Sequence, residues 1–224
     1  MKHKALDMTP TKTQEKIKKI KAATFELIER GDINNISIYD IARHAKIATS
    51  TVYHHYPNIE ALLLSIADDV FDDFDILLKK VEAIPSFTSW QAITLEVEKS
   101  FFQYYQQHPV AMKLLLGQHK FYDLRKADFK HDQQLGKRIQ AIYNKHFNLP
   151  ELPDSYNIFA IALQAADKVY STFYNARGRE IIQPEAGREG IRLALAYLSS
   201  YLPKYLQRVD GTNVVGSDLD YHPS

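Results

Sequence analysis

The chain has 224 residues and a formal net charge of +1. It contains no cysteine, which excludes disulfides, zinc–thiolate sites and a cysteine nucleophile. No apolar run approaches the roughly 20 residues that span a bilayer, and the basic start lacks the apolar segment of a secretory signal. We therefore expect a cytoplasmic protein without a membrane segment. The low glycine count, 8 residues, favours an all-α fold.

The first predicted helix begins at Thr11 or Thr13 and ends at Arg30. Thr11 and Gln14 have the spacing of a capping box, and Gly31 is well placed to end the helix. Apolar residues recur at helical spacing along it. They are Ile17, Ile20, Leu27 and Ile28.

Two short helices follow, over about residues 38–45 and 49–55. Ser37 and Asp40 supply a second capping-box pattern at the start of the first one. The second helix should end before Pro57, because the residue that precedes a proline is disfavoured in the α region.

The rest of the chain also has helical periodicity and no convincing strand. Asn58 can cap the next helix, and the tail 210–224 is expected to be flexible. The prediction is an all-α fold of about nine helices. Those after residue 57 span about 58–84, 90–107, 109–117, 123–148, 154–179 and 184–209.

Two short helices joined by a tight turn and supported by a longer helix form a helix-turn-helix. In that motif the second helix enters the DNA major groove and the first crosses the backbone. Residues 1–57 also hold ten Lys or Arg against six Asp or Glu, which favours a polyanionic partner. Hydroxyl and ring side chains that are not needed for the apolar contact between the two helices can bind phosphates or base edges. They are Tyr39, Thr49, Ser50, Thr51, Tyr53, His54 and His55.

The segments "AATFELIERG" and "SIYDIARHAKIATSTVYHHYPNIEALL" resemble the TetR family of bacterial one-component repressors. The resemblance implies a helix-turn-helix domain over 1–57, with an arm over 1–10, and a helical ligand-binding and dimerisation domain over 58–209. It also implies a homodimer that binds a palindromic double-stranded DNA operator and is released by a small-molecule effector. No cofactor, metal or catalytic residue is implied.

By position, the resemblance implies that Tyr53 and His55 contact phosphates and that Ser37 is a phosphate-binding cap. Thr51 is similar to a backbone or base contact, and the base-contacting positions are Tyr39, Thr49, Ser50 and His54. Simpler alternatives stay open: Tyr53 could be a packing aromatic, and both histidines could be solvated. The lysines Lys2, Lys4, Lys12 and Lys16 either follow the minor groove or form a disordered solubilising tail.

Three positions depart from the family pattern. Lys46 occupies the usual glycine position of the turn, so it must accept a positive φ at a cost of about 1 kcal/mol, or the turn must change; it is also a candidate DNA contact. Ala48 replaces the usual Ser or Thr cap, and we expect Thr49 to take over. Ile59 replaces a phosphate-binding lysine, which should flatten the salt dependence by about one unit of slope.

The second half of the chain is rich in aromatic residues. Pockets between helices of a bundle are typically apolar with a few polar groups, so we expect a ligand cavity there, although the same rings could simply form the core. The predicted lining residues are Phe101, Tyr105, Phe121, Tyr122, Tyr143 and Phe173.

The last two helices have faces rich in alanine and leucine, which predicts a dimer interface between paired helices. A dimer suits a palindrome, because two recognition helices would lie about 34 Å apart. The alternative is that these faces belong to the internal core. The residues are Ala160, Leu163, Ala166, Ile191, Leu195, Leu198 and Leu202.

Two rival functions are a helical protein that binds a protein partner without operator binding, and a helical-bundle enzyme. The missing lysine at Ile59 favours the first over DNA binding. No catalytic motif supports the second. The acidic run "DDVFDDFD" at residues 68–75 is expected to be a solvated face and not a metal site.

Overall fold

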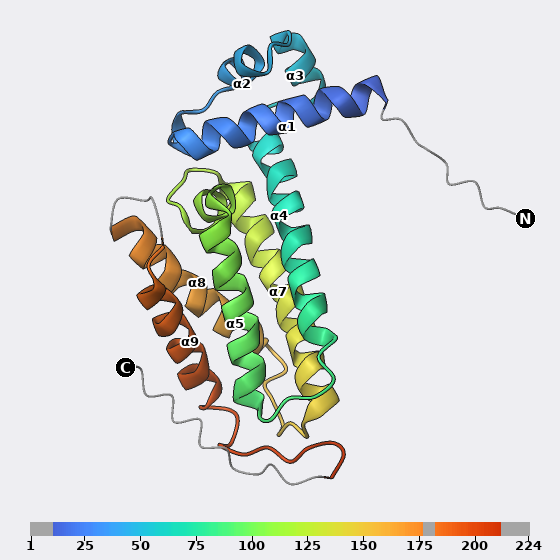
Figure 1. Ribbon diagram of the computed structural model, residues 1–224, viewed down its shortest axis with the longest axis vertical. Coiled ribbons are helices and arrows are strands. Elements are labelled where there is room, and N and C mark those ends of the chain that lie inside the picture. Colours follow the sequence, from blue (N-terminus) through green and yellow to red (C-terminus); the bar gives the residue numbers. More distant parts are fainter. Residues whose placement is uncertain (1–10, 177–181, 212–224) are drawn as a thin grey trace, which may run out of the picture. The chain divides into compact units, whose positions relative to one another are not determined.

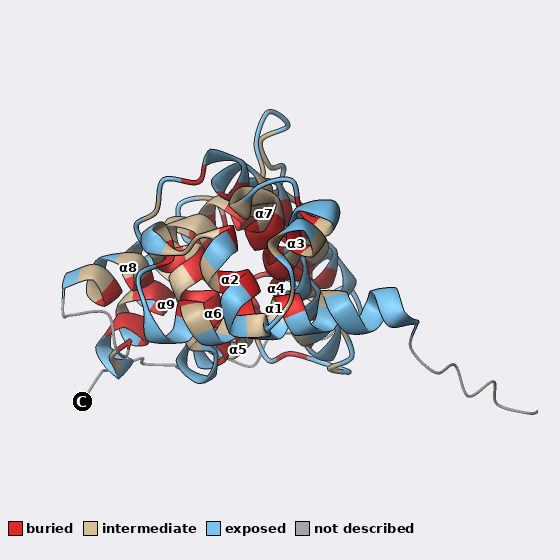
Figure 2. Ribbon diagram, turned by 90° about the horizontal axis from the view of Figure 1, so that it is seen from above, coloured by how far each residue is buried: buried red, intermediate tan, exposed pale blue. Residues whose placement is uncertain are grey.

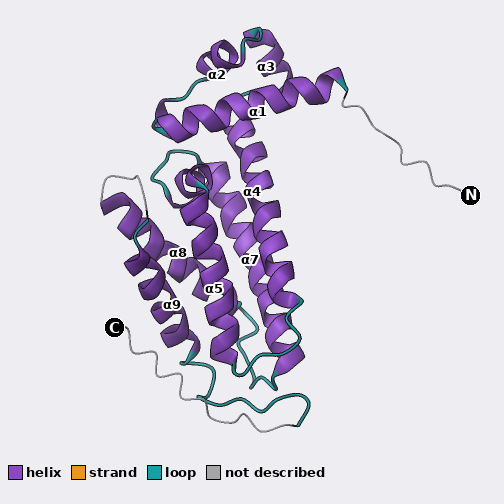
Figure 3. Ribbon diagram, viewed as in Figure 1, coloured by secondary structure: helices purple, strands orange, loops and turns teal. Residues whose placement is uncertain are grey.

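The computed structural model describes residues 11–176 and 182–211. The predicted arm over 1–10 and most of the predicted tail therefore lie outside the described residues. Within these ranges the chain has nine α-helical segments and no strand (Figure 3), which confirms the all-α prediction. None of the helices described is long and apolar enough to cross a membrane.

The helices follow one another along the chain as Figure 1 shows. Their bounds are α1 (Lys12–Arg30), α2 (Ile38–Ala45), α3 (Thr49–His55), α4 (Ile59–Glu82), α5 (Trp90–Gln107), α6 (Pro109–Ala111), α7 (Tyr122–His146), α8 (Ile158–Ala176) and α9 (Pro184–Leu198). A 3-10 turn, Ile33–Asn35, precedes α2, and a π-helix, Met112–Leu116, continues α6.

The chain divides into two compact units, residues 1–66 and 67–224, so the division falls inside α4 and not at the predicted residue 57. The first turns of α4 are tied to the N-terminal unit by polar contacts. The Lys21 ammonium donates to the Ser65 carbonyl at 2.8 Å. Asn58 caps α4 as predicted, since its Oδ1 accepts from the Ala61 amide at 2.8 Å.

Capping boxes fix the helices of the N-terminal unit as the sequence predicted. Thr11 and Gln14 cap α1, and Ser37 and Asp40 cap α2. The core is apolar, and its buried polar side chain, Thr24, donates to a carbonyl of its own helix at 2.8 Å. The first turns of α1 are exposed (Figure 2). The fully buried core residues include Ile20, Ile28, Ile41 and Val52.

In the C-terminal unit α8 packs against both α7 and α9, and α5 packs against α9. Helices α7 and α8 approach closely at Gly136. A Cβ at that position would lie 2.6 Å from the Ala160 backbone nitrogen and Cβ, so only glycine allows this crossing.

Two predicted helix ends were wrong. Helix α8 begins at Ile158 and not near 154, because the Asn157 side chain caps it by accepting from the amides of residues 159 and 160, both at 3.0 Å. Helix α9 ends at Leu198 and not near 209, because Pro203 cannot continue a helix. The chain then turns back, and the Asn148 amide donates to the Gln207 carbonyl at 2.8 Å.

Candidate nucleic-acid interface and interior cavity

The turn between α2 and α3 depends on a left-handed residue. Lys46 has φ 55° and ψ 45°, and it is the only non-glycine residue with positive φ in the described chain. Its amide donates to the carbonyls of Ala42 and Arg43, and the Ile47 amide donates to the Ala42 carbonyl at 3.0 Å. The turn thus keeps the glycine-type geometry, and Lys46 accepts the strain of about 1 kcal/mol that it brings.

Helix α3 begins without a side-chain cap. Ala48 occupies the N-cap position, where its methyl group cannot accept a hydrogen bond. The expectation that Thr49 takes over is wrong, because Thr49 is already the first helical residue and its backbone position does not allow the cap bond.

The polar side chains of α3 are exposed or half-buried, and they make no hydrogen bond to the residues that the structure describes. Tyr53 is 43% exposed, and its ring meets that of Tyr39, which is 66% exposed, edge to face at 6.3 Å. Ser50 and His54 are also exposed, and Thr49, Thr51 and His55 are half-buried. The hydroxyls of Thr49, Ser50 and Thr51 make no hydrogen bond to any described residue, so they are available to an external partner.

Ser37 is less available than the other predicted contacts. Its hydroxyl lies 2.5 Å from Asp40 Oδ2 and accepts from the Asp40 amide at 3.2 Å. The bond from Ser37 holds the pKa of the Asp40 carboxyl below its usual value, so this carboxylate stays charged. Arg43 donates to the same side chain at 2.7 Å.

Tyr56 and Ile59, which follow α3, differ in their roles. Tyr56 is buried and packs in the core, and its hydroxyl lies 3.5 Å from Ser65 Oγ. Ile59 is the first residue of α4 and is half-buried. In the family that the sequence resembles, this position usually carries a phosphate-binding lysine. Here it presents an apolar side chain.

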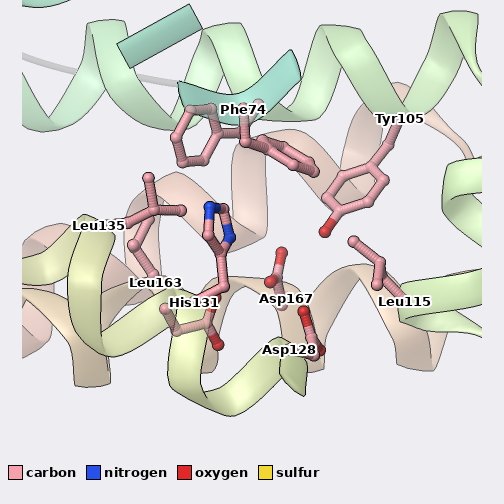
Figure 4. A pocket seen from close by; sticks show the side chains of 10 residues that line it. Phe74, Tyr105, Leu115, Asp128, His131, Leu135, Leu163 and Asp167 are labelled. Atoms are coloured by element: carbon pink, nitrogen blue, oxygen red, sulfur yellow. The ribbon is translucent and has the colours of Figure 1, made fainter. Parts of the chain in front are cut away.

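A cavity lies inside the C-terminal unit, lined from α4, α5, the π-helix, α7 and α8. The prediction placed Phe101 and Tyr105 in a ligand cavity, and the structure brings both to this one (Figure 4). The volume open to solvent-sized groups is about 10 Å³, room for about one water molecule. The other lining residues are Phe74, Leu115, Asp128, His131, Asp132, Leu135, Leu163 and Asp167.

The four other predicted lining residues lie elsewhere. Tyr143 lines a second cavity, where its hydroxyl lies 2.5 Å from Thr94 Oγ1. Phe121 is buried and Phe173 is half-buried, but neither lines one of these two cavities. Tyr122 is 65% exposed, because it is the first residue of α7 and points to solvent.

The acidic residues of the cavity, Asp128, Asp132 and Asp167, were not predicted from the sequence. Burial raises the pKa of Asp128 to about 7, and burial together with the nearby Asp128 and Asp167 raises the pKa of Asp132 to about 9. Burial also raises the pKa of Asp167 well above its usual value. Asp128 and Asp132 are one helical turn apart in a polar stretch. Their spacing predicts that they share one face of the helix, but it does not predict that this face is buried.

Two further titratable side chains lie in this interior. Glu98 is buried and accepts a hydrogen bond from the Tyr170 hydroxyl at 2.9 Å, yet burial raises its pKa to about 8. Burial lowers the pKa of His131, against the opposing effect of Asp75. The imidazole stacks on Phe71 with ring centroids 4.4 Å apart.

The residues predicted for the dimer interface lie mainly inside a single chain. Six of the seven are buried there, and Leu195 is half-buried. Ala160 packs on Gly136 of α7, and Leu163 and Leu198 line the second cavity. Their apolar face is thus a core face, the alternative that the sequence left open.

The acidic run on α4 is partly paired. Asp73 accepts from the Tyr104 hydroxyl at 2.7 Å, and Arg138 bridges Asp75 and Glu82. Across the ranges that the structure describes, no group of three or more His, Cys, Asp or Glu side chains could hold a metal ion.

Comparison with known proteins identifies the N-terminal unit. Residues 20–66 match the model of the bacterial regulatory proteins of the tetR family. The HTH-type transcriptional regulator EthR of Mycobacterium tuberculosis is 29% identical over 89 residues, which are 40% of this chain and 41% of EthR. The match thus spans about two fifths of the length of this curated relative.

Solved structures extend the likeness of fold over most of the chain. A TetR-family transcriptional regulator from Streptomyces coelicolor has a TM-score of 0.63 at 13% identity, covering 84% of this chain and 99% of its own. SmeT, the repressor of the Stenotrophomonas maltophilia multidrug efflux pump SmeDEF, has a TM-score of 0.62 at 16% identity, covering 86% and 93%. A SmeT–triclosan complex is similar as well, with a TM-score of 0.60 at 15% identity, covering 85% and 93%.

Proposed function

We propose that this chain, which belongs to the TetR family of bacterial transcriptional regulators, is a cytoplasmic repressor that binds a palindromic operator as a homodimer. The observation that carries this proposal is the set of exposed or half-buried hydroxyls and imidazoles on α3 that make no hydrogen bond to any residue the structure describes. Such groups form no hydrogen bond with the described residues of the N-terminal unit, whose core is apolar. They can donate hydrogen bonds to phosphate oxygens and to acceptors on base edges.

The proposed contacts divide into two kinds. Tyr53 and His55 bind backbone phosphates, with Lys46 as an additional cation in the turn. Thr49, Ser50, Thr51, Tyr39 and His54 contact the edges of bases. Ser37 acts indirectly, by fixing the start of α2, since both its hydroxyl and its amide serve the capping box with Asp40.

The homodimer is proposed to form through the outward faces of α8 and α9, since the inward faces are occupied. Leu193 is 41% exposed, Ala196 is exposed, and Ile161 and Ala165 are half-buried. A Leu193→Asp variant should sediment as a monomer at micromolar concentration, while Leu193→Ala stays dimeric. A wild-type chain that sediments as a monomer would contradict the dimer.

Release of the operator is proposed to follow binding of a small molecule in the cavity of the C-terminal unit. A 100-fold loss of DNA affinity requires the ligand to prefer the released state by about 2.7 kcal/mol. Helix α4 carries this preference, because its residues fall in both units and Phe74 lines the cavity.

The test is a mobility-shift titration at low salt with DNA from the neighbourhood of the protein's own gene. A specific complex that competitor DNA does not displace supports operator binding. Unchanged mobility up to micromolar protein would favour the second candidate, a regulator that acts through a protein partner, which the apolar Ile59 supports. An Ile59→Lys variant separates the two, since added charge rescues a weakened DNA contact and does nothing for a partner-binding surface.

A further inference from the structure

The cavity of the C-terminal unit contains acidic side chains that the proposed function leaves unexplained. Asp128, Asp132 and Asp167 lie on its wall, and Glu98 is near enough to raise the pKa of Asp167. The buried polar and charged side chains of the described chain include no Lys or Arg. When these carboxyls ionise, no buried lysine or arginine of the described chain can therefore neutralise their charge.

Arg138, on the same helix as Asp128 and Asp132, is already occupied. Arg138 donates to Glu82 at 2.9 Å and forms an ion pair with Asp75, both on α4. A buried carboxylate without a cation costs several kcal/mol when it is charged, and proteins keep such groups where a ligand uses them.

His131 supplies a second, independent observation. Its side chain is buried, with 8% exposed, and its Nε2 makes no hydrogen bond; Asp75 Oδ1 lies 3.7 Å away, an ion-pair distance when the ring is protonated. Figure 4 shows the imidazole pointing into the cavity beside Asp128 and Asp167. An unsatisfied buried nitrogen is rare, and here it lies in the wall of a cavity.

The other wall of the cavity is aromatic. Phe74 lies with its ring centroid 4.8 Å from that of Phe101 and 5.3 Å from that of Tyr105. Ring faces attract cations, most strongly when water is excluded. A metal ion does not suit the site, since the acidic side chains do not converge as a metal-binding group anywhere in the described ranges.

We propose that the effector is an organic cation, an amine or amidine whose charged head lies among Asp128, Asp132 and Asp167 and whose apolar body lies against Phe74, Phe101 and Tyr105. A cation supplies the opposite charge that these carboxyls lack when they ionise, a neutral ligand does not, and an anion would be repelled by the ionised forms. The proposal rests on the proposed function for the consequence on DNA, whereas the binding itself does not depend on it.

Binding should release protons. Burial raises the pKa of Asp132 to about 9, so this carboxyl is largely protonated at pH 7.5. A cation beside it favours the ionised form, and the displaced proton goes to the buffer. A neutral ligand in the same cavity would leave this proton in place.

The experiment is calorimetry of the full chain without DNA at pH 7.5. The probes are phenylalkylamines from phenethylamine to 6-phenylhexylamine, each compared with the alcohol and the carboxylate of the same chain length. We expect the best amine to bind about tenfold or more tighter than its alcohol, its carboxylate not to bind, and protons to be released in two buffers of different ionisation enthalpy. Tighter or equal binding of the alcohol, or no amine binding at millimolar concentration, would overturn the proposal.

Substitutions of single acidic residues test which carboxyl binds the charged head of the amine. Asp132→Asn should lower the affinity for the amine about tenfold and leave the affinity for the alcohol unchanged. Asp68→Asn, an exposed acid on α4, is the matched control and should change neither. If Asp132→Asn does not fold by circular dichroism, Asp128→Asn, which is half-buried, replaces it. Full amine affinity in a folded variant of this kind overturns the assignment of the site.

The two proposals fail separately. Amine binding in calorimetry without any effect on the mobility-shift titration would refute operator release and leave the cation site standing. Release of the operator only by neutral or anionic compounds would refute the cation site and leave the regulatory function standing.

Discussion

The two units of the chain place the polar side chains that their folds do not require in opposite locations. In the N-terminal unit such groups face solvent on α3, over an apolar core. In the C-terminal unit titratable side chains lie in the interior, where Glu98, His131 and Asp132 are buried and the Nε2 of His131 has no hydrogen-bond partner. A polar surface on a stable core suits a partner that approaches from outside, such as DNA. Polar groups within the core suit a small ligand that binds inside the unit. The stability of this unit should then depend on whether that ligand is bound.

The sharpest test of this contrast is the pH dependence of stability. Glu98 and Asp132 have pKa values raised by burial to about 8 and about 9, above the ordinary 4.5 and 3.8. Their folded forms hold protons that the unfolded chain has lost, so their contribution to stability is complete below pH 4 and is lost as the pH rises towards 9. The free energy of unfolding should fall by about 1 kcal/mol per pH unit for each group between pH 5 and 8.

Urea denaturation at pH 6, 7 and 8 measures this slope. Asp132→Asn should reduce it by about 1 kcal/mol per pH unit, since that variant has no proton to lose. Equal stability of the wild-type chain at pH 6 and pH 8 would contradict the buried-acid description of the C-terminal unit.

A hydroxyl on the N-terminal surface should matter for binding and not for stability. Tyr53→Phe should lower operator affinity about tenfold, the worth of one hydrogen bond to a charged phosphate. The free energy of unfolding should change by less than about 0.5 kcal/mol, because the hydroxyl has no internal partner. Tyr122→Phe, another exposed tyrosine, should change neither quantity. Fluorescence anisotropy and urea denaturation measure both, and a loss of stability in Tyr53→Phe would place that hydroxyl in the fold.

Adding charge at the start of α4 should strengthen the same surface. Ile59→Lys is expected to raise DNA affinity about fivefold at moderate salt and to steepen the salt dependence by about 0.9 unit of slope. Ile76→Lys, on the same helix but within the C-terminal unit and 50% exposed, is the control with equal charge. Equal gains from the two substitutions would show a non-specific charge effect.

The smallest expected effect concerns the uncapped start of α3. Ala48→Ser supplies the missing acceptor for the first turn and should raise the free energy of unfolding by about 0.5–1 kcal/mol. Ala141→Ser, at an exposed position within α7, gains no cap and should be neutral or slightly destabilising. Thermal denaturation distinguishes them, and no gain at residue 48 would indicate that the backbone there does not allow the cap.

The N-terminal unit was predictable because its determinants are local. Capping boxes, a proline and the strained Lys46 each act within a few residues of the chain. The extent of the unit was not, because the contact between Lys21 and Ser65 joins residues far apart in the sequence. Nor does an apolar helix face tell which partner covers it. Ala160 and Leu163 therefore predicted a dimer interface and proved to be core.

The acidic interior was beyond the sequence for a different reason. Asp128 and Asp132 lie in the stretch "RKADFKHDQQ", whose polarity is typical of a solvated helix face. Their burial depends on where α8 brings Asp167, and α8 can lie so close because Gly136 leaves room for Ala160. Of the residues named from aromatic content, Phe101 and Tyr105 line the cavity and Tyr122 faces solvent, because composition does not state the direction of a side chain.

The small volume of the cavity, about 10 Å³, has a consequence for rates. A molecule the size of a phenylalkylamine cannot enter this space until the surrounding helices separate. Opening then precedes binding, so the observed association rate should stop rising at high ligand concentration and level off at the opening rate of the helices. A stopped-flow titration would thus report a property of the protein alone, the time it takes to open, whichever cation is used to detect it.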